Sequence, residues 1–139
     1  MIPGSFPPAP SGCDPAVWPS MSPVPEDDAR LLASGPLRFT ARRAWFDAER
    51  RLADSAASGV DAEVVSPFPP LLNYALPVAA GRDLACCVNE YIAGLCAAAP
   101  GQIYGLGTVP LQDPDLAAAS LPGMRCRPSG GAAGWCSPG

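Results

Sequence analysis

The fold that we predict rests on one stretch: Gln102-Ile103-Tyr104-Gly105-Leu106-Gly107-Thr108-Val109-Pro110-Leu111-Gln112-Asp113-Pro114. It is a short apolar run that ends at a proline and is followed by an alanine-rich segment, which is typical of a strand, a loop and the start of a helix. Glycines inside an apolar strand mark a place where other atoms come close to the backbone. Because Pro110 has no N–H to donate to a sheet, the strand ends before it.

The same plan occurs earlier in the chain. Residues 59–67 are a β-branched run that begins with a glycine and closes with a proline, so we predict a strand over 60–65. Helices are predicted over 40–58, 83–99 and 115–121. This alternation of helix and strand predicts an α/β fold with a parallel sheet, in which functional side chains lie on the loops after the strands.

Both long predicted helices carry end signals. Thr40 is the predicted N-cap of the first helix, and Gly59 follows its end. The second helix begins at Asp83 and stops before Pro100, and its apolar residues are expected to face the core because they recur at helical spacing. These residues are Leu84, Val88, Tyr91, Ile92 and Leu95. The loop 67–74 before it is apolar and rigid, and we expect it to pack over the mouth of a cavity.

The charge of the chain excludes some partners. The formal net charge of -4, from 9 basic and 13 acidic residues, indicates neither a nucleic-acid partner nor an anionic membrane surface. The first residues lack the basic start and apolar core of a signal peptide, and no apolar run reaches the ~20 residues of a membrane span. We therefore expect a cytoplasmic protein that binds neither nucleic acid nor membrane.

Proline and glycine, with 19 and 14 residues, concentrate at the two ends of the chain. We predict a Pro-rich N-terminal loop region (1–36), a βα domain (37–121) and a disordered tail (122–139), whose composition is typical of a frameshifted reading. The motif Pro7-Pro8-Ala9-Pro10 has the spacing of a polyproline ligand. A surface loop held by Trp18 is the interpretation that the composition favours.

Six cysteines occur without a C-x-x-C pair, so neither a zinc knuckle nor a thioredoxin-like motif is predicted. Free thiols are favoured over a disulfide scaffold in a cytoplasmic chain. Cys86, Cys87 and Cys96 share one predicted helix and leave a thiol-based metal or redox protein as an alternative. Neighbouring helical residues point about 100° apart, however, which is a poor geometry for chelation.

Four segments carry a family pattern. They are Val64-Val65-Ser66-Pro67-Phe68-Pro69-Pro70, Asn73-Tyr74, Val88-Asn89-Glu90-Tyr91-Ile92-Ala93 and Tyr104-Gly105-Leu106-Gly107-Thr108-Val109-Pro110-Leu111-Gln112-Asp113-Pro114. In this order and spacing they resemble the aminocarboxymuconate-semialdehyde decarboxylase branch of the amidohydrolase superfamily. Trp45 and residues 50–54 fit the same pattern.

The resemblance implies a partial (β/α)8 TIM barrel of about two to three βα units. It also implies a metal-dependent enzyme that decarboxylates or hydrolyses small carboxylate substrates, with zinc or another divalent ion as Lewis acid. The family's metal site needs histidine ligands, and this chain contains no histidine. No metal ligand and no catalytic residue is therefore assigned, and we expect a fragment that is inactive alone.

The resemblance also implies a position for substrate binding. Arg38 lies near the place of an arginine with which relatives hold a substrate carboxylate, through the bidentate geometry of guanidinium. Arg42 or Arg43 is an alternative counterpart. From the residues alone, the basic cluster over 38–51 is interpreted as a solvated surface, with a carboxylate site as the alternative.

Tyr74 is the second predicted substrate-binding residue. Together with Ser66 and Asn73 it lies on the loop expected at the catalytic mouth, although packing is the favoured role for all three. A non-catalytic interaction module is the alternative function for the whole chain. Its open strand edges and apolar loops would dock onto a full-length relative, in a homo- or hetero-oligomer.

Overall fold

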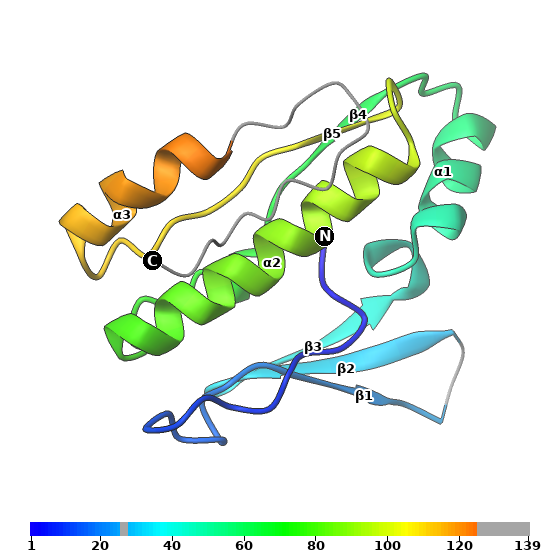
Figure 1. Ribbon diagram of the computed structural model, residues 1–139. Coiled ribbons are helices and arrows are strands. Elements are labelled where there is room, and N and C mark those ends of the chain that lie inside the picture. The colour runs from blue at the N-terminus through cyan, green and yellow to red at the C-terminus, as the bar shows by residue number, and fades with distance from the viewer. Residues whose placement is uncertain (26–27, 125–139) are drawn as a thin grey trace.

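A computed structural model describes residues 1–25 and 28–124. Within these residues the chain forms three α-helices, three short 3₁₀ helices and two small sheets (Figure 1). In chain order the elements are β1 (Ser20–Pro23), β2 (Ala29–Ser34), β3 (Leu37–Arg42), η1 (Arg43–Trp45), α1 (Ala48–Ala57), β4 (Glu63–Val65), η2 (Pro69–Leu71), α2 (Val78–Ala98), β5 (Ile103–Gly105), α3 (Pro114–Ser120) and η3 (Leu121–Met124).

The first sheet is an antiparallel meander with the strand order β1-β2-β3. β2 and β3 are joined by Gly35 and Pro36, and Gly35 has a φ of 55°. A two-residue hairpin turn with glycine first requires this left-handed conformation. The expectation of a loop region over 1–36 is therefore wrong for β1 and β2. Pro19 and Pro23 lie at the two ends of β1 and Pro36 lies in the turn, where a missing N–H breaks no ladder, and most of the other prolines precede β1.

The N-terminal segment before β1 is a surface loop, as the composition indicated. The Trp18 Nε1–H donates a hydrogen bond to the carbonyl oxygen of Pro7 at 2.8 Å. The Trp18 side chain is buried, while Pro7 and Pro8 are exposed. The interpretation of a loop held by Trp18 is thus confirmed.

Two aspartates decide where helices α1 and α3 begin. The Asp47 carboxylate accepts from the Arg50 N–H at 3.0 Å, so α1 begins at Ala48. The predicted cap Thr40 is wrong, because Thr40 belongs to β3 and faces Leu31 of β2 across the sheet. Asp113 caps α3 in the same way, close to the predicted start.

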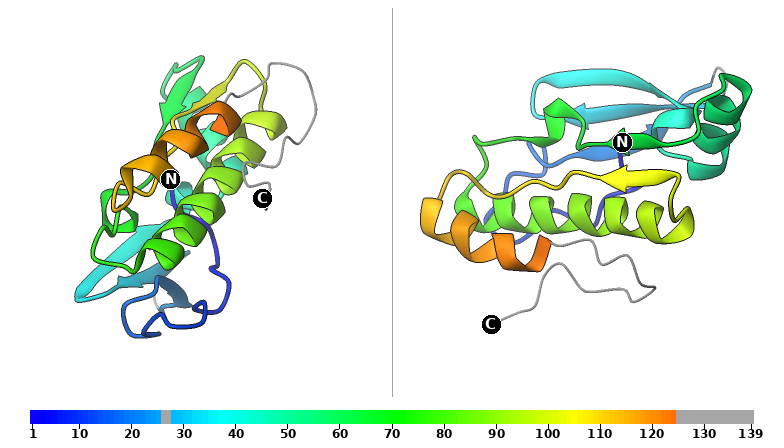
Figure 2. Two further views of the ribbon diagram at one scale, coloured as in Figure 1. Left: turned by 60° about the vertical axis from the view of Figure 1, so that its left-hand side comes forward. Right: turned by 90° about the horizontal axis from the view of Figure 1, so that it is seen from above.

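The second sheet is a single parallel pair, in which Val64 of β4 lies beside Tyr104 of β5. Helix α2 makes the crossover between the two strands, as parallel pairing requires. In Figures 1 and 2 it runs along the pair, with α3 and the antiparallel sheet on opposite sides of it. The predictions of a strand around Val64, a strand around Tyr104 and a helix between them are therefore confirmed.

The predicted partial TIM barrel is wrong. The described residues form a small mixed α/β fold with one antiparallel and one parallel sheet, and a barrel needs eight parallel strands. Residues 20–42 form the antiparallel meander, and the parallel sheet of the described residues consists of two strands of three residues each. The tail predicted over 122–139 lies, from residue 125 onward, outside the described residues.

One part of the core lies between α2 and the parallel strands, and the same cluster extends to Ile2, Trp18 and Leu32. The predicted stripe on α2 is buried at Leu84, Val88, Ile92 and Leu95, and Val65 and Ile103 of the two strands are buried with it. A Cβ added at Gly105 would collide with the Ile92 side chain and lie 3.0 Å from the Cys96 Sγ. The predicted close approach to the strand backbone is therefore present, and glycine is required there.

We predict that Gly105→Ala destabilises the fold by about 1–3 kcal/mol, because the new methyl group overpacks the contact with Ile92. Gly94→Ala is the matched control, since Gly94 lies in α2 and an added Cβ meets nothing within 4 Å. That change should instead stabilise the helix by about 0.5–1 kcal/mol. Urea denaturation of both variants gives the two values, and equal effects in both would contradict the close packing.

Candidate functional site

Asn89 holds the loop that follows β5. Its Nδ2 donates to the Thr108 carbonyl oxygen, and its Oδ1 accepts from the Thr108 N–H, both at 2.8 Å. Asn89 is only 5% exposed. Because β5 has ended before Thr108, the backbone groups of that residue lack a strand partner, and the buried carboxamide satisfies both of them.

Gln112 belongs to the same loop as Thr108, four residues farther along the chain. Its carboxamide packs so closely on Gly81 of α2 that a Cβ there would collide with it. The Gln112 Nε2 lies 3.4 Å from the Asn73 carbonyl oxygen, and the buried Oε1 has no hydrogen-bond partner among the described residues. Three segments of the family pattern, around 73, 89 and 112, therefore meet at the carboxyl end of β5.

The space among these side chains is nearly filled. About 10 Å³ is left between Tyr74, Thr108 and Gln112 and the neighbouring helix residues, which is at most the room of one water molecule. The cavity mouth expected under the loop 67–74 is thus absent from the described structure. In this structure, the residues around the small space at the carboxyl end of β5 serve packing and hydrogen bonding.

The two predicted substrate-binding residues lie on different parts of the fold. Arg38 is exposed on β3, and its Nη1 donates to the carbonyl oxygens of Gly35 at 2.6 Å and Leu37 at 2.8 Å. Tyr74 is exposed on the loop between η2 and α2. No hydrogen bond joins them within the described residues, and their role in substrate binding stays a prediction.

Most of the basic cluster over 38–51 is engaged in ion pairs. Arg43 pairs with Asp28 at 2.8 Å and with Asp47 at 2.7 Å. Two further pairs are Arg50 with Asp54 at 2.9 Å and Arg51 with Glu63 at 2.6 Å. These ion pairs favour the interpretation of the basic cluster as a solvated surface. They are less consistent with a single carboxylate-binding site.

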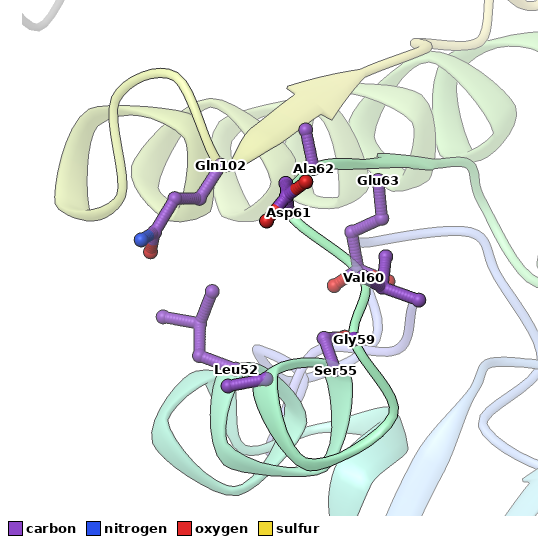
Figure 3. A pocket seen from close by; sticks show the side chains of 9 residues that line it. Leu52, Ser55, Gly59, Val60, Asp61, Ala62, Glu63 and Gln102 are labelled. Carbon is purple, nitrogen blue, oxygen red and sulfur yellow. The ribbon is translucent and has the colours of Figure 1, made fainter.

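A larger hollow than the small space at the carboxyl end of β5 lies at the opposite end of the parallel sheet, near the amino end of β4. It has a volume of about 230 Å³, and Figure 3 shows α1 on one side and the segment 59–63 with Gln102 on the other. Leu52, Ser55, Asp61 and Gln102 contribute to its lining. Sequence reasoning missed this hollow, because it depends on how α1 packs beside β4.

The described residues do not fit the zinc ion that the resemblance implies. No group of three or more histidine, cysteine, aspartate or glutamate side chains in residues 1–25 and 28–124 is placed to hold a metal ion. Cys86 is disulfide-bonded, so the expectation of free thiols is wrong at this position. Cys13 and Cys87 are free, and burial together with the charge of Glu90 raises the pKa of the Cys87 thiol.

No family model matches this chain, and its relation to the amidohydrolase superfamily therefore stays a prediction. Among the helices of the described residues, none is both long and apolar enough to span a membrane.

We predict that Asn89→Ala destabilises the protein by about 2–3 kcal/mol. The change leaves the partly buried N–H and C=O of Thr108 without the Asn89 partner, and a lost partner costs about 1–3 kcal/mol for a fully buried group. The control is Asn73→Ala, whose side chain only accepts one exposed bond from the Ala75 N–H at 3.3 Å. Thermal unfolding of both variants tests the difference, and an Asn89 effect no larger than that of Asn73 would refute the role assigned to this carboxamide.

Alkaline pH should weaken the fold through Tyr91. Its hydroxyl donates to the Phe46 carbonyl oxygen at 3.0 Å, and burial, together with the charge of Asp47, raises its pKa to about 12. The ordinary pKa is about 10, so the stabilisation is complete below pH 10 and is lost as the pH rises from about 10 to 12. Urea midpoints across this range should fall more steeply for the wild type than for Tyr91→Phe. Parallel curves would show that Tyr91 is not the group responsible.

Proposed function

We propose that this chain is a non-catalytic interaction module that docks onto a longer amidohydrolase-related protein in the cytoplasm. One observation supports the proposal most directly. Val64, Tyr104 and Leu106 are 63%, 56% and 58% exposed, and they lie together on one face of the β4–β5 pair. Parallel sheets are normally covered on both faces.

The exposed row follows from the register of the two strands. Val64 and Tyr104 are direct neighbours, and Leu106 shares their face because side chains alternate along a strand. The Leu106 N–H still donates to the Val65 carbonyl oxygen at 2.8 Å, so the ladder continues to this residue. The opposite face is the one that packs on α2, since Val65 and Ile103 are buried there.

Within residues 1–25 and 28–124, the outer edge of β4 pairs with no strand. The Glu63 N–H and the Val65 carbonyl oxygen are bonded toward β5, which directs the backbone groups of Val64 to the outer side. Farther on, the Met1 amino group donates to the Ser66 carbonyl oxygen at 2.7 Å, and the Phe68 N–H donates to the Met1 carbonyl oxygen at 3.3 Å. An added strand would therefore meet an open edge before Ser66.

A longer relative as partner agrees with the composition of the chain. The family's metal chemistry needs histidine, which this chain lacks, so the divalent metal and the small carboxylate substrate would belong to the partner. The proposed complex is hetero-oligomeric. Its contact is the apolar sheet face, since contiguous exposed apolar side chains are typical of protein interaction sites.

A second candidate is that the chain is itself part of a metal-dependent decarboxylase or hydrolase. The contact of Asn89 with Thr108 favours it, because two segments of the family pattern position each other through this pair. In this candidate Arg38 and Tyr74 would contribute to binding a carboxylate, and histidines from outside residues 1–139 would hold the metal.

The docking proposal predicts that Val64→Lys with Tyr104→Lys abolishes complex formation, because two charges would be buried in the interface. The measurement is analytical ultracentrifugation of the chain mixed with a purified full-length amidohydrolase-related decarboxylase from the same genome. Val78→Lys, at the start of α2 and away from this face, is the matched control and should bind like the wild type.

Two outcomes would contradict the proposal. One is the absence of any complex with the wild-type chain. The other is turnover of a carboxylate substrate by the 139-residue chain alone when zinc or manganese is added, which would support the second candidate instead.

A further inference from the structure

The antiparallel sheet has one blunted edge and one open edge. β1 is flanked by Pro19, ends at Pro23 and is followed by Pro25, and prolines prevent pairing along an edge strand. β3 lies at the other edge and, within the described residues, pairs only with β2. It contains no proline or glycine.

The turn decides which backbone groups of β3 are free. Ser34 and Leu37 close the two-residue hairpin and exchange hydrogen bonds, as the closing pair does in such turns. Bonded and non-bonded positions alternate along an antiparallel strand. The N–H and C=O groups of Arg38, Thr40 and Arg42 therefore point to the open side.

The side chains of β3 divide into two rows. Arg38, Thr40 and Arg42 are exposed on the outer face, and no acidic residue of β1, β2 or β3 lies on that face. Leu37 and Phe39 form the inner row and are 44% and 37% exposed. A strand added here would meet positive charge on one face and apolar surface on the other.

The charges on β3 are available to a partner. Arg38 is held in place by its two bonds to the hairpin turn, and Arg42 has no hydrogen-bond or ion-pair partner among the described residues. The neighbouring Arg43, in contrast, is already paired with Asp28 and Asp47. The inner row is continuous with the core through Phe39, whose ring lies 5.3 Å from that of Phe68 in an edge-on contact.

A second copy of the chain does not fit this edge. If two β3 strands paired antiparallel about Thr40, Arg38 of one copy would lie opposite Arg42 of the other on the same face. Like charges directly opposite each other are destabilising. Arg38 and Arg42 therefore oppose self-association through this edge. They favour an added strand that places acidic residues opposite them.

We infer that the open edge of β3 binds an extended segment of a partner protein in which acidic and apolar residues alternate. The segment adds a fourth strand, its backbone pairs with Arg38, Thr40 and Arg42, its carboxylates face the two arginines, and its apolar side chains extend the row of Leu37 and Phe39. Six residues, about 20 Å of strand, match the length of β3. This surface is separate from the β4–β5 face and does not depend on the docking proposed there.

The test uses the whole chain and a fluorescein-labelled peptide in which three glutamates alternate with three valines. Fluorescence anisotropy at about 0.15 M salt, where distant charges are screened, should show saturable binding of this peptide and none of its lysine–valine counterpart. The double variant Arg38→Glu with Arg42→Glu should bind the glutamate–valine peptide about tenfold more weakly or worse. The same variant should gain affinity for the lysine–valine peptide. Arg82→Glu, which reverses an exposed charge on α2, is the control and should leave the affinity unchanged.

A second measurement keeps the test independent of the variants' folding. A glutamate–valine peptide N-methylated on the amides that would face β3 has the same charge but cannot pair, and it should fail to bind the wild-type chain. Unchanged binding of this peptide would overturn strand addition. Equal affinity of the acidic peptide for wild type and the double variant, or tighter Arg38- and Arg42-dependent binding of a single-stranded DNA of equal charge, would overturn it as well.

Discussion

Packing of helix α2 on strand β5 holds the fold together. Parallel strands cannot be joined by a tight turn, so β4 and β5 form a sheet only if the helix between them packs back onto it. Gly105 allows this because Ile92 and Cys96 occupy the place of its missing side chain. Asn89, one turn before Ile92, then holds the loop that leaves the sheet.

The antiparallel meander is attached to this unit through aromatic side chains. The Phe68 ring lies 5.3 Å from Phe39 and 5.2 Å from Trp45, and Tyr91 of α2 reaches the backbone of Phe46. Aromatic pairs of this kind add about 0.5–1.5 kcal/mol each beyond the area that they bury. The two sheets are thus joined by side-chain packing and a few hydrogen bonds, with no strand shared between them among the described residues.

Among the described residues, the fold leaves two parts of its sheets uncovered. At the carboxyl ends of β4 and β5, where α/β folds usually bind ligands, Asn89 and Gln112 fill the space with packing and hydrogen bonds. Two features that lack a partner among the described residues lie elsewhere, namely the exposed row of Val64, Tyr104 and Leu106 and the edge of β3. Binding partners commonly use uncovered sheet faces and open strand edges, and both interaction proposals start from these two features.

Local elements with short-range signals could be predicted from the order of the amino acids alone. The apolar stripe on α2, the strands around Val64 and Tyr104 and the close approach at Gly105 are of this kind, because periodicity and glycine placement act within a few residues. Other features arose only when distant segments packed together. Thr40 became a strand residue because β2 lies opposite it, and Asn89 became a support for Thr108 because α2 crosses over β5. Both outcomes depend on partners distant in sequence, whose pairing no local pattern encodes.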